Sequence, residues 1–134
     1  MSELQKMREG QTYNCLDQEL ASIRNKAFQY IYQFNNELDV ENRAKLLKQL
    51  GVSISCSSYI APPIEMSYGC HLSIGKNSYI NSGALILDNA RVTIGDHVMI
   101  GPRVQIYTAA HSVDACERIA GDEVAKPVVL NDKA

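Results

Sequence analysis

Apolar residues recur at helical spacing through the first 51 residues. Asp17 stands at an N-cap position, the Asn35–Asn36 pair interrupts the pattern, and Asp39 begins a further segment that ends at Gly51. Between the first two signals, apolar residues three or four apart form one stripe: Leu20, Ile23, Ala27, Tyr30, Ile31 and Phe34. With a capping-box start at Ser2, the pattern predicts three helices, and residues 1–51 are interpreted as a helical cap.

From about residue 52 the helical period gives way to a period of six. Seven aliphatic residues keep it, with one slip of two positions: Ile74, Ile80, Ile86, Val92, Ile94, Ile100 and Ile106. Small or β-branched residues follow four positions later: Ser78, Ala84, Ala90, Val98 and Val104. An α-helix would scatter positions six apart around its axis, so this part of the chain is not helical.

A period of six fits a short strand followed by a turn. Three such faces close a triangular coil of eighteen residues, with the aliphatic residue inside and the small residue near a corner. Stacked coils pair as parallel strands and bury a continuous apolar column. Residues 52–134 are therefore predicted to form part of a parallel β-helix, with a loop leaving the coil at about 108–127. An irregular antiparallel sheet is the alternative.

Composition narrows the set of partners. The 134 residues suit one compact domain, and 13 basic against 15 acidic residues give a net charge of −2 without a basic cluster. We therefore expect no nucleic-acid or membrane partner. No apolar stretch resembles a signal peptide or a membrane span, so a cytoplasmic location is expected. The four cysteines form no C-x-x-C pair and are expected to be free thiols, and no metal is expected.

Residues 79–111, YINSGALILDNARVTIGDHVMIGPRVQIYTAAH, closely resemble the maltose and galactoside O-acetyltransferase family of hexapeptide-repeat acyltransferases. The runs at 7–10, 67–69 and 125–127 are similar to that family too. The resemblance implies a mainly β fold, a left-handed parallel β-helix carrying an N-terminal helical cap. It also implies a homotrimer that moves an acetyl group from acetyl-CoA to a sugar hydroxyl.

The resemblance also implies the site residues. The T-A-x-H motif marks His111 as the catalytic histidine, and imidazole suits a general base because its pKa lies near neutral pH. Ser67 and Asn81 match acceptor-binding positions, and Asp17 matches an acidic acceptor contact in the cap. Asp17 is equally a helix cap, and Asn81 is equally a solvated residue. We expect direct attack within a ternary complex, without an acyl-enzyme.

The chain also departs from the family pattern. Gly83 and Asn89 replace residues that bear on acceptor choice, and Ser112 follows His111 where proline is usual. The family continues past the position of Ala134 into coils that supply most of the coenzyme A cleft. We therefore expect a truncated member with most of its cofactor-binding residues beyond residue 134 and no measurable activity as the 134-residue chain.

Two other functions remain open. One is a non-catalytic, truncated remnant. The other is a zinc-dependent carbonic anhydrase of the γ type, which uses the same coil and three histidines around one metal. His71, His97 and His111 suffice in number, but their spacings of 26 and 14 do not resemble that family.

Overall fold

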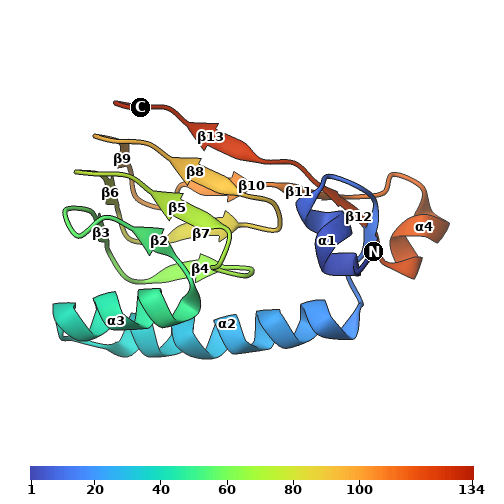
Figure 1. The fold of residues 1–134 in the computed structure, drawn as a ribbon, viewed down its shortest axis with the longest axis horizontal. Coiled ribbons are helices and arrows are strands. Elements are labelled where there is room, and N and C mark those ends of the chain that lie inside the picture. Colours follow the sequence, from blue (N-terminus) through green and yellow to red (C-terminus); the bar gives the residue numbers. More distant parts are fainter.

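The computed structural model describes residues 1–134, and Figure 1 shows a stack of short strands above two long helices. The cap consists of α1 (Glu3–Arg8), β1 (Tyr13–Asn14), α2 (Gln18–Asn36) and α3 (Val40–Leu50). The stack consists of β2 (Ser53–Ile54), β3 (Tyr59–Ile60), β4 (Ile64–Met66), β5 (Leu72–Ile74), β6 (Tyr79–Ile80), β7 (Ala84–Leu87), β8 (Val92–Ile94), β9 (Met99–Ile100), β10 (Gln105–Tyr107) and β13 (Val128–Leu130). Between β10 and β13 lie β11 (Ala109–His111), α4 (Ala115–Ala120) and β12 (Asp122–Ala125).

The predicted helix signals are confirmed. Ser2 forms a capping box with Gln5, the Asp17 carboxylate accepts the first backbone N–H groups of α2, and Asp39 caps α3. Gly51 ends α3 with φ of +101°, a conformation that favours glycine. The stripe of α2 buries Ala27, Ile31 and Phe34 against α3 and the coils, whereas Leu20, at its first turn, is buried in a separate, smaller core. None of the four helices has both the length and the apolar character of a membrane span.

The strands form the predicted three-sided prism. Its faces are the parallel sheets β2–β5–β8–β13, β3–β6–β9 and β4–β7–β10. All seven aliphatic residues of the repeat point inward, and none is more than 8% exposed. Four of the five small positions are buried too. Val104 is 36% exposed, because it directly precedes β10, the edge strand of its sheet.

The coil is longer than the sequence predicts. From β2 to β10, paired residues lie twenty positions apart in every face, as in Ile54↔Ile74, Ile80↔Ile100 and Met66↔Ile86. The prediction of eighteen-residue coils is therefore wrong, because the slip of two positions recurs in each coil. The extra residues lie where one sheet turns into the next, at 67–71, 87–91 and 107–127. We call this edge of the prism the long corner.

The excursion at 108–127 carries regular structure, whereas the sequence predicts a loop. β11 and β12 pair antiparallel, and β1 of the cap pairs with the other edge of β12, which gives a sheet of order β1–β12–β11. In Figure 1 this sheet lies with α1 and α4 at one end of the prism. A small second core lies beneath it: Met7, Tyr13, Leu20, Tyr68, Ala90 and Ala125. The cap and the excursion therefore fold onto each other.

The prism core predicts a clear stability effect. Ile86 has no exposed surface, so Ile86→Ala should lower the free energy of unfolding by about 2–5 kcal/mol. Ile119→Ala is the matched control, because Ile119 is 80% exposed, and it should change the value by less than about 0.5 kcal/mol. Urea unfolding followed by circular dichroism measures both. Equal effects would contradict the inward placement of Ile86.

Candidate functional site

His111 lies on the excursion directly above the long corner. The register of β11 and β12 sets it opposite Glu123, and its Nε2 lies 3.6 Å from Glu123 Oε1. The side chain of His111 is 58% exposed and that of Glu123 only 10%. The site therefore pairs an imidazole that is exposed to solvent with a carboxylate that is largely buried.

Cys15 completes this cluster from the cap. It follows β1, and its backbone N–H donates to the Gly121 carbonyl at 2.9 Å. Its Sγ, a ring nitrogen of His111 and a carboxylate oxygen of Glu123 all lie within 4.8 Å of one another. We call these three residues the Cys15–His111–Glu123 cluster. Sequence reasoning found His111 but missed Cys15 and Glu123.

Two buried tyrosines form the floor beneath the cluster. Tyr13 and Tyr68 are each 1% exposed. Asn89 Nδ2 donates to the Tyr13 hydroxyl at 3.0 Å, and Arg24 donates to the Tyr68 hydroxyl at 2.8 Å and to the Cys15 carbonyl at 3.0 Å. Burial raises the pKa of both phenols, so the floor stays uncharged at neutral pH.

The Cys15 thiol is also uncharged at neutral pH. Burial raises its pKa, and the negative charge of Glu123 raises it further, whereas the guanidinium of Arg24 opposes both effects. Because the thiolate is the reactive form of cysteine, this thiol is a poor nucleophile as it stands.

Side chains of each coil fix the long corner of the coil below. The Asp88 carboxylate accepts the backbone N–H groups of Tyr68 at 2.8 Å and His71 at 3.2 Å. One coil higher, Thr108 Oγ1 accepts the Ala90 N–H at 2.9 Å and donates to the Leu87 carbonyl at 2.6 Å. The excursion that carries His111 is therefore anchored at its first residue.

Comparisons with known proteins show which family has this architecture. Residues 6–50 match the maltose acetyltransferase hexapeptide capping motif. A Dictyostelium discoideum protein assigned as an acetyltransferase is 40% identical over 134 residues, which cover all of this chain and 70% of that protein. The crystal structure of a maltose O-acetyltransferase from Clostridium difficile 630 matches with a TM-score of 0.90 and 32% identity over 99% of this chain and 79% of that one. This chain belongs to the maltose and galactoside O-acetyltransferase family.

A second solved member was determined with a ligand. The hexapeptide-repeat acetyltransferase of Vibrio cholerae O1 biovar eltor, in complex with acetyl coenzyme A, matches with a TM-score of 0.83 and 35% identity. The match covers 99% of this chain and 79% of that chain. The solved members are left-handed parallel β-helices, so the predicted fold class, handedness included, is confirmed.

Ser67 and Asn81 lie at opposite ends of one face. Ser67 begins the long corner, half-buried, with its N–H bonded to the Ile86 carbonyl at 3.3 Å. Asn81 follows β6, and its Oδ1 accepts the Ser82 N–H at 2.8 Å. The four residues of β7 lie between the two corners and span roughly 10 Å. A single chain therefore does not bring Asn81 to His111, and the binding role of both residues stays a prediction.

Asp17 is the N-cap of α2 in this structure. Its Oδ2 accepts the N–H groups of Glu19 at 3.1 Å and Leu20 at 3.2 Å. It is Cys15, two residues earlier, that lies beside His111. The helix-cap interpretation of Asp17 is confirmed, and its contact with an acceptor stays a prediction.

The other two histidines do not join the cluster. His71 is 2% exposed; its Nε2 accepts from Arg8 Nε at 3.0 Å, and its Nδ1 lies 2.7 Å from the Asp88 carbonyl oxygen. Both ring nitrogens are therefore engaged. His97 lies in an exposed turn with φ of +56°. The carbonic anhydrase alternative needs three free imidazoles and gains no support from this arrangement.

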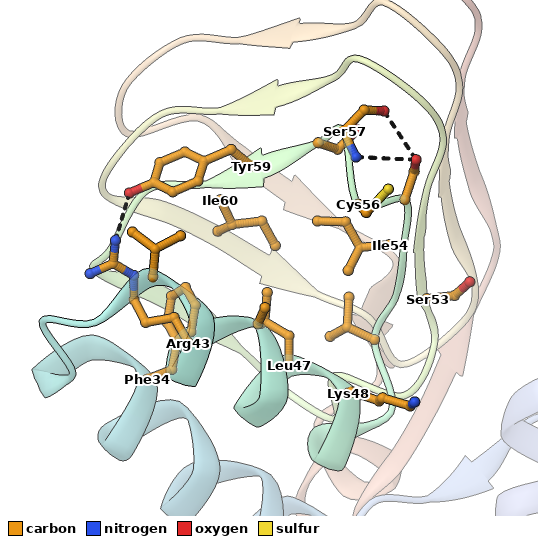
Figure 2. A pocket seen from close by; sticks show the side chains of 15 residues that line it. Phe34, Arg43, Leu47, Lys48, Ser53, Ile54, Cys56, Ser57, Tyr59 and Ile60 are labelled. Atoms are coloured by element: carbon orange, nitrogen blue, oxygen red, sulfur yellow. Dashed lines mark hydrogen bonds between the residues drawn. The ribbon is translucent and has the colours of Figure 1, made fainter.

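A cavity of about 680 Å³ lies far from this chemistry, between α3 and the first coil. Figure 2 shows Phe34, Leu47, Ile54 and Ile60 around it, with Arg43 donating to the Tyr59 hydroxyl at 2.9 Å on its rim. It is lined by no histidine and no carboxylate, and nine of its fifteen lining residues are hydrophobic. We interpret it as the packing gap at the base of the prism.

The buried His71 predicts a pH dependence of stability. Burial lowers its pKa below the ordinary 6.5, so the unfolded state binds the proton more readily. Its contribution to stability should be complete above about pH 6.5 and should fall as the pH drops from there toward the folded pKa. The slope for one proton is at most about 1.4 kcal/mol per pH unit.

Unfolding free energies at pH 7.5 and 5.5 test this dependence. His71→Gln should lose part of the pH dependence of the native protein. His97→Asn, a change at an exposed histidine, should keep it. An unchanged pH profile in His71→Gln would show that His71 takes up its proton equally in both states.

Proposed function

We propose that this acetyltransferase moves an acetyl group from acetyl-CoA to a sugar hydroxyl, with His111 as the general base. The observation that carries the proposal is the pair of an exposed imidazole and a buried carboxylate, 3.6 Å apart, on the long corner of a family coil. The complex of the Vibrio cholerae relative supports acetyl-CoA as the donor, and the maltose O-acetyltransferase of Clostridium difficile supports a sugar as the acceptor.

In this proposal His111 carries out both proton transfers and Glu123 supports it. His111 accepts the proton that the sugar hydroxyl loses as its oxygen bonds to the acetyl carbonyl carbon. Glu123 stabilises the imidazolium that forms, because its carboxylate is held nearby in a poorly solvated position. His111 then returns the proton to the sulfur of coenzyme A as the carbon–sulfur bond breaks. A backbone N–H near the acetyl group would stabilise the oxyanion between these steps.

Direct transfer is favoured over an acyl-enzyme. The one thiol in the cluster, Cys15, stays protonated because burial and Glu123 raise its pKa. A protonated thiol does not compete with a sugar hydroxyl that His111 deprotonates. Ser67, Asn81 and Asp17 would hold the sugar around this base.

Replacing the imidazole tests the base assignment. His111→Ala should lower kcat/KM for acetyl transfer to maltose or a galactoside by about 10²–10⁴-fold, because it removes general-base catalysis. His97→Asn is the control and should keep the native rate. Release of the coenzyme A thiol, followed with a chromogenic disulfide, measures turnover. Near-native turnover in His111→Ala would rule out the base role.

A second measurement does not depend on turnover: saturation-transfer NMR of the glycoside. Ser67→Ala should weaken the transfer signal relative to the native chain. Absence of both turnover and glycoside binding would count against a sugar as the acceptor.

We further infer that three copies associate through the face that carries β4 and β7. A groove there is mostly apolar and includes Phe28 and Tyr32, which are 70% and 64% exposed, with Met66, Leu85 and Leu87 beside them. Such an apolar surface is typical of an interface between subunits. Association would also bring Asn81 of one copy toward the long corner of another, which a single chain does not do.

A charge in this groove should separate the copies. Phe28→Glu should shift the mass measured by sedimentation equilibrium from three chains to one, because burying the carboxylate in the interface is costly. Lys26→Glu, an exposed change two residues away, is the control and should leave the mass at three chains. A native protein that sediments as one chain would contradict the trimer.

A further inference from the structure

The Cys15–His111–Glu123 cluster brings three different donor atoms to one point. A thiol sulfur, an imidazole nitrogen and a carboxylate oxygen lie within 4.8 Å of one another, and no other set of three such groups meets in this chain. Zinc bonds these donors at about 2.0–2.3 Å in a tetrahedron, which sets the donors about 3.3–3.6 Å apart. The His111–Glu123 separation of 3.6 Å already fits, and no other pair is more than 4.8 Å apart, so none needs to close by more than about 1.5 Å.

We propose that these three residues bind one Zn²⁺ ion and that the bound ion blocks acetyl transfer. Three protein ligands leave one tetrahedral position for water. The metal would be an inhibitor and not a cofactor, since the proposed chemistry uses His111 without it.

The donor set selects the class of metal. Magnesium and calcium prefer oxygen donors, whereas thiolate and imidazole together favour zinc. As the sulfur–zinc bond forms, the Cys15 thiol releases its proton to solvent. The thiolate and the Glu123 carboxylate then offset the two positive charges of the ion, and the ion in turn stabilises a thiolate that burial alone disfavours.

The backbone holds the three donors in place before any metal arrives. Glu123 is paired with Tyr13 on one side and with His111 on the other, in the antiparallel sheet β1–β12–β11. Cys15 is fixed by its N–H to Gly121 and by Arg24 on its carbonyl. Ligands supported in this way lose little freedom on binding, which favours affinity.

The effect on catalysis follows from the lone pairs of imidazole. A neutral ring has one nitrogen that accepts a proton and one that already carries one. If zinc occupies the accepting nitrogen, His111 has no lone pair left for the sugar proton. The inhibition therefore rests on the proposed role of His111, whereas metal binding rests on the three side chains alone.

Equilibrium dialysis against Zn²⁺ tests the site without any turnover. The native chain should bind one ion per chain, and Cys15→Ser should weaken binding by about 100-fold or more, since even second-shell changes at metal sites cost about 10–100-fold. Cys56→Ser is the matched control, because Cys56 is exposed and lies between β2 and β3, outside the cluster. Circular dichroism checks that each variant is folded, and Glu123→Gln provides a second weakening variant.

Cobalt substitution adds a spectroscopic readout. Co²⁺ bound to the native chain should show a thiolate-to-cobalt charge-transfer band that is absent in Cys15→Ser and present in Cys56→Ser. Zinc binding that is equal in the native chain and Cys15→Ser, a missing charge-transfer band, or equal affinity for Mg²⁺ would each overturn the site.

Turnover measurements distinguish zinc binding from its proposed inhibitory effect on acetyl transfer. Zn²⁺ should abolish acetyl transfer by the native enzyme, a chelator should restore it, and any turnover of Cys15→Ser should resist the same zinc concentration. Cys15-dependent zinc binding without inhibition would keep the metal site and overturn the base role of His111. Inhibition that persists in Cys15→Ser would overturn the inhibitory site.

Discussion

The direct stacking of inward aliphatic residues, coil upon coil, is the constraint on which this structure depends. From β2 to β10 each strand hydrogen-bonds to strands twenty residues away, so no face can accept an extra residue without breaking the pairing of every coil above it. Extra residues must therefore go to a corner. Two per coil go to the long corner, and the third coil adds the excursion there, since Leu130 pairs with Ile94 at 36 positions instead of 20. The His111–Glu123 pair lies at this corner because the excursion leaves the prism there.

The features that repeat or act locally could be predicted from the sequence. A buried Ile86 or Ile100 recurs at a fixed distance from its neighbours, and Asp17, Asp39 and Gly51 act within one turn of their own helix. His111 could be singled out as a candidate because it is the last residue of a short motif, and its catalytic role stays a prediction. The eighteen-residue coil was wrong for a physical reason: hydrophobic spacing reports which residues face inward, but not how many residues a corner needs to turn.

The partners of His111 could not be predicted in this way. Cys15 is 96 residues away along the chain, and it meets His111 only because β1 pairs with the edge of β12. The position of Glu123 depends on a shorter-range pairing. Had Ala109–His111 and Asp122–Ala125 been recognised as a hairpin, its register would have set Glu123 opposite His111. Both strands are short, and nothing in their composition distinguishes them from a loop.

The points where the excursion leaves and rejoins the prism affect how such proteins can diverge. The Lys126 N–H donates to the Thr108 carbonyl at 2.8 Å, so the chain leaves the prism and returns to it at neighbouring points, and Val128 resumes the pairing with Val92. Residues inserted or deleted between β11 and β12, at the far end of the excursion, leave the strand pairing of the coils undisturbed. The length of the segment around His111 and Glu123 can therefore change while the folding of the coils beneath is unaffected.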